Sequence, residues 1–198
     1  MIENQPEGNE IERYKVILLG DAGVGKTSLC RRYTENTFDF KMNPTIGSSH
    51  IRTRVNVDGR SVELMIWDTA GQEQFASLVP LYSRNTDVCL VVASVVNSDS
   101  CSHIMTWIKR INESGVYPSV VVAINKVDLV EDQPPSIDEI RKKYTEGIDY
   151  IFLTSARTGS GIEQLFQQVA AEAISHKKEP ANNIQPINEE EKKSKDCC

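Results

Sequence analysis

Two hydrophobic spacings alternate along the chain, and they predict different elements. Uninterrupted apolar runs at residues 88–93 and 120–124 are typical of strands buried on both faces of a parallel sheet, and the short, mostly apolar run at 14–19 also predicts a buried strand. Over residues 104–111 and 162–173, apolar side chains instead recur at every third or fourth position. That spacing predicts helices with one buried face. Strands and helices therefore alternate along most of the sequence.

A predicted hairpin interrupts this alternation. Residues 51–57 place apolar side chains on one side of an extended segment, and Asp58-Gly59 predicts a tight turn into a returning strand over 62–66. A helix is expected over 25–33 and a last short strand over 150–153. The order β-α-ββ-α-β-α-β-α-β-α predicts an α/β fold, in which a mostly parallel six-stranded sheet has one antiparallel strand and helices cover both faces.

Two of the predicted helices carry capping-box signals at their starts. Ser136 stands three positions before Glu139, and Ser160 stands three positions before Glu163. In such a box the serine side chain accepts a hydrogen bond from a backbone N–H of the first turn, and the glutamate bonds back to the serine N–H. We therefore expect these helices to begin directly after Ser136 and Ser160.

Both ends of the sequence lack this patterning. Residues 1–12 are polar and acidic, and residues 176–198 mix charges with prolines and few aliphatic side chains. Such segments bury too little apolar surface to offset the entropy of ordering them. We expect a flexible arm over 1–12, one folded domain over 13–175 and a disordered tail over 176–198.

Composition and charge narrow the class of protein. With 39% hydrophobic and 25% charged residues, the chain is composed like an ordinary globular protein. Lysine and arginine number 22 against 28 aspartates and glutamates, a net charge of −6, so we expect no nucleic-acid partner. The apolar runs are too short to span a membrane, and no secretory signal is seen. Five cysteines, an odd number, fit a reduced cytosolic compartment.

Residues 20–27 match the phosphate-binding pattern G-x-x-x-x-G-K-[ST] and lie between a predicted strand and a predicted helix. Glycines let successive N–H groups turn inward around an anion, and the helix start adds partial positive charge. Lys26 supplies a cation for the terminal phosphates, and the Thr27 hydroxyl is a hard oxygen ligand for Mg²⁺. The candidate phosphate-binding residues are Ala22, Gly23, Val24, Gly25, Lys26, Thr27 and Ser28. The pattern alone leaves ATP and GTP open.

A second motif, Asn125-Lys126-Val127-Asp128, follows the predicted strand over 120–124. A carboxylate can accept two parallel hydrogen bonds from a base with adjacent N–H donors, which guanine has and adenine lacks. Because parallel strands place their carboxyl ends at one edge of the sheet, the two motifs are expected to meet there. Together they indicate a guanine nucleotide.

With the segments 43–47, 67–73 and 154–156, these motifs resemble the Ras superfamily of small GTPases, and within it the Rab branch. The resemblance covers about residues 13–175. It implies a GTP-binding domain with the three-layer, Ras-like P-loop NTPase fold. It also implies GTP or GDP as the bound nucleotide, with Mg²⁺ as cofactor.

The resemblance implies roles at the base. Phe38 would pack on the guanine face, Lys126 would line its other side, and the Ala156 amide would meet the guanine oxygen. The other base-site residues are Asn125, Asp128, Ser155 and Arg157, the last standing where the family often has lysine.

At the phosphates, the resemblance implies that Thr27, Thr45 and Asp68 hold Mg²⁺, with Thr45 bound only when the γ-phosphate is present. The Gly71 amide would contact that phosphate. Gln72 can donate and accept hydrogen bonds, which suits it to orient the attacking water. No arginine in the motifs is placed to act in cis. We therefore expect slow hydrolysis that an activating protein raises by inserting an arginine.

Partners follow from the same resemblance. Effectors would bind a surface made by Ile46, Gly47, His50, Trp67 and Tyr82, where His50 replaces the usual phenylalanine. An exchange factor, a GTPase-activating protein and a GDP-dissociation inhibitor are also implied. We expect the protein to act as a monomer.

The Cys197-Cys198 pair resembles the acceptor of two geranylgeranyl groups in Rab proteins. Two lipid chains are needed because a single chain gives only marginal membrane binding. We expect the protein on the cytoplasmic face of an endosomal or Golgi membrane, cycling with the cytosol, where it would regulate vesicle traffic.

Two other classes of function stay open on the residues alone. One is a scaffold that binds GTP and hydrolyses it very slowly, which Thr27, Thr45 and Gln72 argue against. The other is a small-molecule kinase with a phosphate loop. The motif at 125–128 and the lack of an arginine-rich lid argue against that class.

Overall fold

The computed structural model describes residues 11–45, 47–71, 78–130, 135–145 and 147–178. Six strands form a single sheet in the order β2-β3-β1-β4-β5-β6. The strands are β1 (Arg13–Leu19), β2 (Ser48–Val57), β3 (Arg60–Thr69), β4 (Val88–Ser94), β5 (Ser119–Asn125) and β6 (Tyr150–Leu153). All neighbours pair in parallel except β2 and β3, which are antiparallel. The predicted fold class is confirmed.

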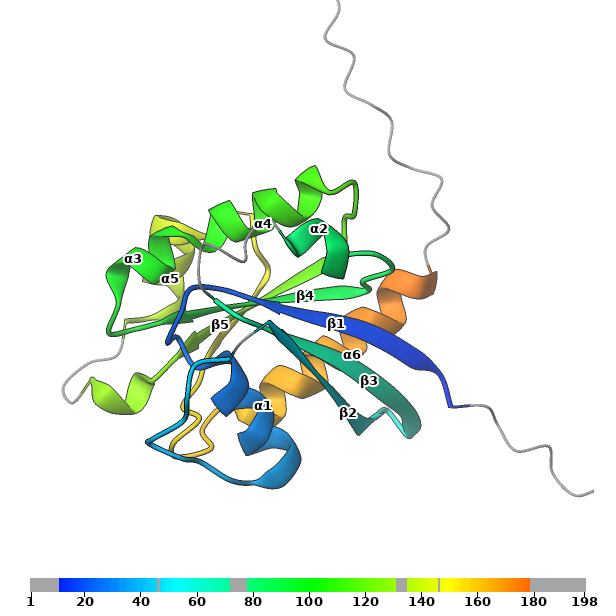
Figure 1. Ribbon diagram of the computed structural model, residues 1–198, viewed down its shortest axis with the longest axis horizontal. Helices are drawn as coiled ribbons and strands as arrows, with labels where there is room; N and C mark the ends of the chain where they lie inside the picture. The colour runs from blue at the N-terminus through cyan, green and yellow to red at the C-terminus, as the bar shows by residue number, and fades with distance from the viewer. Residues whose placement is uncertain (1–10, 46, 72–77, 131–134, 146, 179–198) are drawn as a thin grey trace, which may run out of the picture.

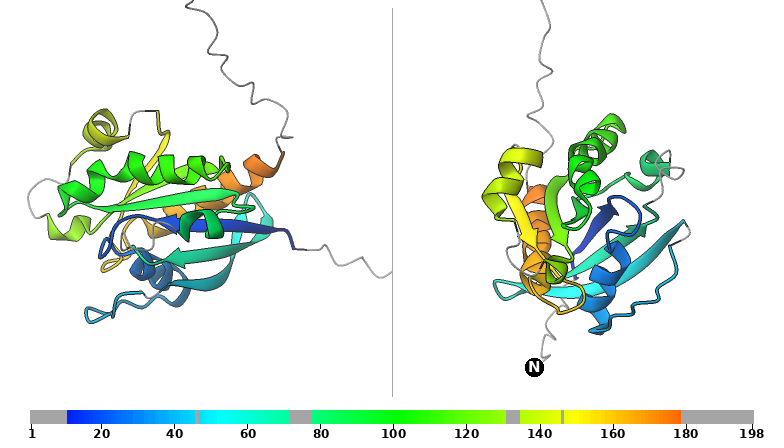
Figure 2. Two further views of the ribbon diagram at one scale, coloured as in Figure 1. Left: turned by 45° about the horizontal axis from the view of Figure 1, so that its top comes forward. Right: turned by 90° about the vertical axis from the view of Figure 1, so that its left-hand side faces the viewer.

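Helices cover both faces of the sheet (Figure 1). They are α1 (Lys26–Glu35), α2 (Val79–Tyr82), α3 (Ser98–Ser102), α4 (Ile104–Glu113), α5 (Ile137–Tyr144) and α6 (Ile162–Lys178). Apolar side chains of α1 and α6 pack into one core cluster, and those of α2, α3, α4 and α5 pack into a second. The turned view in Figure 2 shows the sheet between blue α1 and green α4. The architecture is therefore three layers.

Local sequence accounts for the buried central strand β4 and for the turn between β2 and β3. Every residue of β4 is buried, as expected for a strand covered on both faces. The hairpin of β2 and β3 turns at Asp58 and Gly59, which both have positive φ, 49° and 79°. That conformation matches the twist of the two strands, so the predicted turn is confirmed.

One of the two predicted capping boxes forms. The Ser136 side chain accepts a hydrogen bond from the Glu139 N–H, and the Glu139 carboxylate accepts one from the Ser136 N–H. The prediction at Ser160 is wrong, because α6 begins at Ile162 and the Ser160 N–H donates to Thr158 Oγ1 of the preceding loop, at 3.3 Å, and not to Glu163. The tight fold of that loop takes priority over the local capping signal.

The end of the last helix and the buried cysteines bear on two further expectations. Helix α6 runs on to Lys178, so the helix passes the tail boundary predicted at 176. Cys30, Cys89 and Cys101 are free and buried, as expected for packing residues. Across the described ranges, every helix is too short or too polar to cross a membrane.

The fold places one set of loops at one edge of the sheet. Strands β1, β3, β4, β5 and β6 run parallel, so the segments that follow them emerge together. Residues 20–25 follow β1, Ala70 and Gly71 follow β3, Lys126 follows β5, and Thr154 follows β6. Ligands of open α/β sheets bind beyond this edge. The described residues of the sequence motifs therefore lie at this edge of the sheet.

Candidate functional site

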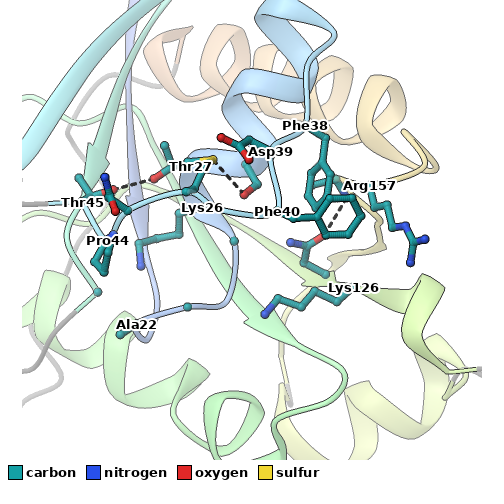
Figure 3. A pocket seen from close by; sticks show the side chains of 18 of the residues that line it. Ala22, Lys26, Thr27, Phe38, Asp39, Phe40, Pro44, Thr45, Lys126 and Arg157 are labelled. Atoms are coloured by element: carbon teal, nitrogen blue, oxygen red, sulfur yellow. Dashed lines mark hydrogen bonds between the residues drawn. The ribbon is translucent and has the colours of Figure 1, made fainter.

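A cavity of about 460 Å³ opens at this edge (Figure 3). Loops after β1, β3, β5 and β6 line it, and the segment between α1 and β2 closes one side. Its lining residues include Ala22, Gly23, Gly25, Lys26, Thr27, Ser28, Phe38, Thr45, Gly71, Asn125, Lys126, Asp128, Ala156 and Arg157. The structure thus brings the predicted phosphate-binding and base-binding motifs into one cavity.

Lys26 lies at the enclosed end of the cavity, where its side chain is buried. Its Nζ donates to the carbonyl oxygens of Gly20, at 2.8 Å, and Asp21, at 2.9 Å. Burial lowers the pKa of Lys26 to about 8, although the carboxylates of Asp68 and Asp21 oppose this. The ammonium is thus held inside the phosphate loop, where it can exchange carbonyl partners for phosphate oxygens.

Two glycines leave no room for a side chain at this end. A Cβ on Gly25 would lie 2.4 Å from Asn125 Nδ2, and φ at Gly25 is 101°. A Cβ on Gly71 would lie 2.3 Å from both Lys26 Nζ and the Asp21 carbonyl oxygen. The backbone at Gly71 therefore approaches the phosphate loop directly, which puts its amide beside the predicted phosphate position.

Three oxygen-bearing side chains converge near Lys26. Thr27 Oγ1 donates to Asp68 Oδ2 at 2.6 Å and lies 2.8 Å from Thr45 Oγ1. Asp68 Oδ1 is buried and accepts no hydrogen bond from any residue that the structure describes. Burial raises the pKa of Asp68, against the Thr27 hydrogen bond and the charge of Lys26.

Hydroxyl and carboxylate oxygens are the ligands that Mg²⁺ prefers, and it commonly uses few protein ligands together with phosphates and water. A buried carboxylate oxygen without a partner is costly unless a cation or water satisfies it. The donor set of Thr27, Thr45 and Asp68 therefore fits Mg²⁺.

The base end is organised around Asn125. Its Nδ2 donates to the Val24 carbonyl at 2.9 Å, and its Oδ1 accepts from the Ala156 N–H at 3.2 Å. Asn125 thus joins the phosphate loop to the loop after β6. Asp128 Oδ1 accepts from Ser155 Oγ at 2.6 Å, which orients the carboxylate at the cavity wall.

Aromatic and cationic side chains surround the same end. Phe38 and Phe40 meet edge to face with ring centroids 4.9 Å apart. Lys126 lies across the cavity from them in Figure 3, and its backbone has φ of 67°. A flat base would fit between these groups.

A backbone hydrogen bond joins the segments before β2 and after β3. The Ala70 N–H donates to the Gly47 carbonyl at 2.8 Å. Gly47 follows the Thr45 segment, and Ala70 precedes Gly71. The two segments expected to contact the γ-phosphate are therefore linked across the end of the hairpin.

Sequence reasoning missed four hydrogen bonds that hold the site. Asp21 Oδ1 accepts from Trp107 Nε1 at 2.8 Å, and Asp21 Oδ2 lies 2.7 Å from His103 Nδ1, so the phosphate loop is tied to the start of α4. Arg32 of α1 donates to the carbonyls of Ala156, at 2.7 Å, and Arg157, at 2.8 Å. No local pattern marks such pairs, which are brought together only by packing.

Three of the predicted effector residues, His50, Trp67 and Tyr82, form an aromatic cluster on β2, β3 and α2. The His50 and Trp67 rings are 5.5 Å apart, and Trp67 and Tyr82 are 6.0 Å apart. Lys15 Nζ lies 4.8 Å above the Trp67 ring. His50 is exposed, so an imidazole stands at the edge of this aromatic cluster.

Some predicted residues lie outside those that the structure describes. They are Ile46, Gln72, Cys197 and Cys198.

Comparison with known proteins agrees with this geometry. The family model described as "Ras family" matches residues 15–175. The chain is 37% identical over 175 residues to "Ras-related protein Rab-22A" of Mus musculus, covering 87% of this chain and 89% of that protein. The proteins of the same name from Homo sapiens and Canis lupus familiaris are each 37% identical over 163 residues, 81% of this chain and 83% of theirs.

Proposed function

The chain belongs to the Ras family as a Rab-type small GTPase, and on this premise we propose that it is a nucleotide-controlled switch of vesicle traffic. It hydrolyses GTP to GDP, as its family does. Our proposal assigns this activity to the cavity described above and names the residues that carry it.

One observation carries the assignment. The phosphate loop and the Asn125–Asp128 segment, far apart in sequence, line one cavity and are joined by the hydrogen bond from Asn125 Nδ2 to the Val24 carbonyl. A triphosphate at Lys26 and a guanine at Asp128 can therefore belong to one molecule. An isolated glycine-rich turn would not be paired with a carboxylate for the base.

Charge stabilisation is the main task of the protein in phosphoryl transfer. We assign Lys26 and the inward-facing amides of residues 22–27 to the β- and γ-phosphate oxygens. Thr27, Thr45 and Asp68 would hold Mg²⁺, which when bound neutralises charge on these oxygens. Gln72 would orient the attacking water.

The output of the reaction is a conformation. Thr45 and Gly71 would contact the γ-phosphate, and losing it would release both segments. The surface of Ile46, Gly47, His50, Trp67 and Tyr82 would present the GTP-bound state to effectors. Exchange, activating and GDP-dissociation-inhibiting proteins would control the cycle.

Membrane attachment would come from Cys197 and Cys198, each carrying a geranylgeranyl group. Two chains suffice for stable anchoring, whereas one does not. We place the protein on the cytoplasmic face of an endosomal membrane, with a Golgi membrane as the second location. Mass spectrometry of the native protein would measure the lipid, and a double Cys→Ser variant should leave the membrane fraction.

The activity is tested by binding and single-turnover assays on the purified chain with Mg²⁺. GTP should displace bound fluorescent GDP, and ATP should not, because adenine lacks the paired donors that Asp128 accepts. Gln72→Leu should keep GTP affinity while slowing phosphate release about 10-fold or more. Gln164→Leu, an exposed position on α6, is the matched control. Equal displacement by ATP and GTP would remove the proposal.

A further inference from the structure

The base end of the cavity has an unusual rim. Phe40 is 74% exposed, although its ring borders the cavity. Most of this large aromatic side chain therefore stays in water at the mouth of the cavity. Phe40 lies outside the motifs of the phosphate loop and the base-binding segments, so its placement needs its own explanation.

Phe40 connects two segments that lie on opposite sides of the cavity mouth. On one side its ring meets Phe38 edge to face, at 83° and 4.9 Å. On the other side the guanidinium carbon of Arg157 lies 5.2 Å from the Phe40 ring centroid. Arg157 Nη1 is also 3.9 Å from Asp128 Oδ2. A continuous line of contacts thus crosses the mouth from Phe38 to Asp128; its Phe38, Phe40 and Arg157 members are labelled in Figure 3.

The two sides are held to different degrees. The Arg157 backbone is fixed by Arg32, which donates to the Arg157 and Ala156 carbonyls from α1. The Phe40 segment is held by a local hydrogen bond from Lys41 N–H to Asp39 Oδ1, at 2.8 Å. Met42, two residues after Phe40, accepts a weak hydrogen bond from Ser28 Oγ of α1 at 3.7 Å. The contact of Phe40 with Arg157 joins this segment to the loop after β6, and it can open while the Arg32 hydrogen bonds to that loop remain.

We propose that Phe40 and Arg157 form a clasp across the base end of the cavity, and that opening this clasp limits the rate at which guanine nucleotide leaves. This inference rests on the proposed function, because it concerns the same cavity. A guanidinium stacks on aromatic faces and also pairs with carboxylates, so Arg157 can hold Phe40 and reach Asp128 together. The clasp acts on release and takes no part in the phosphate chemistry.

The experiment measures the dissociation of fluorescent GDP from the full chain in Mg²⁺ buffer, chased with excess GDP. Phe40→Ala and Arg157→Ala should each release the nucleotide about 5-fold faster, the size expected for losing one exposed cation–π contact. Because both substitutions remove the same contact, the double variant should be far slower than the roughly 25-fold product of two independent effects. Phe40→Tyr, which keeps the ring, should release at the wild-type rate.

Tyr117→Ala is the matched control, since Tyr117 is an exposed aromatic residue remote from the cavity, and it should leave release unchanged. The association rate constant and the unfolding temperature of Phe40→Ala should stay at wild-type values, whereas damage to the fold would move both. Wild-type release from Phe40→Ala, or a fully multiplicative double variant, overturns the clasp and leaves the proposed function standing. A wild-type chain that binds no GDP overturns both.

Discussion

The two ends of the nucleotide cavity are built in opposite ways. At the phosphate end, Lys26 is only 6% exposed, Asp68 is fully buried, and a side chain at Gly71 would collide with its neighbours. At the base end, Phe40 and Arg157 are both exposed, and the guanidinium carbon lies 5.2 Å from the ring centroid. The same ligand would therefore be enclosed at one end and only bordered at the other.

This difference separates two properties of binding. A buried, preorganised set of charged and polar groups interacts strongly with a triphosphate, because burial keeps water away from these groups and their positions are already fixed. Exposed side chains are screened and free to move, so they change rates and selectivity by smaller steps. Substitutions at the two ends should therefore differ in size as well as in kind.

Removing the buried ammonium of Lys26 should have the largest effect on nucleotide binding, and it is the strongest test of the difference between the two ends. Lys26→Ala should weaken GTP binding about 1,000-fold, because the phosphates lose a desolvated charge. Calorimetric titration of GTP gives the affinity directly. Lys142→Ala on α5, where the lysine is exposed, is the control and should bind as the wild type does. A loss of only a few-fold would mean that both ends contribute alike.

Changing the acceptor for the base should have the next largest effect. Asp128→Asn should weaken GTP about 100-fold, since a charged acceptor of paired donors becomes a mixed donor and acceptor. Xanthosine triphosphate, which presents a carbonyl at that position, should gain affinity in the same competition assay. Asp138→Asn on the exposed face of α5 should change neither nucleotide. If GTP and xanthosine triphosphate weaken together, Asp128 does not read the base.

The pH dependence of nucleotide affinity should be a property of the phosphate end of the cavity, where Lys26 lies. Burial holds the pKa of unliganded Lys26 at about 8. A triphosphate binds the ammonium, so affinity is fully present well below pH 8, is about halved at pH 8 and falls about 10-fold by pH 9, where a proton must be taken up first. Calorimetry at pH 8.5 in buffers of different ionisation enthalpy should detect this uptake. Binding heats that are independent of the buffer would contradict it.

The smallest predicted effect concerns the support of the base loop. Arg32→Ala removes two hydrogen bonds to the carbonyls of Ala156 and Arg157, so GDP should dissociate about 3-fold faster. Arg31→Ala, the exposed neighbour, is the matched control in the same stopped-flow experiment. Unchanged release in Arg32→Ala would show that the loop after β6 keeps its position without α1.

The sequence predicted the positions of most strands and helices, because these depend on the spacing of nearby apolar residues. Apolar runs and helical spacing located strands such as β4 and helices such as α4, because burial follows a short period. Motif loops were placed together because parallel strands end at one edge of the sheet. Base-site residues such as Asn125 and Asp128 could therefore be predicted to share a cavity with the phosphate loop.

Contacts made by packing carry no such signal. Asp21 meets His103 and Trp107 only because α4 lies over the start of the phosphate loop. Ser160 has the residues of a capping box, but its N–H donates to Thr158 Oγ1 in the loop before it and not to Glu163. Phe40 is visible as an aromatic residue two positions after Phe38, and only the structure shows that it faces Arg157.

The hydrogen bond from Ala70 to the Gly47 carbonyl has a consequence for signalling. It couples the segment of Thr45 to the segment of Gly71. If both contact the terminal phosphate as proposed, release of one segment favours release of the other. A protein that binds the β2–β3 hairpin at this end would then detect both changes together.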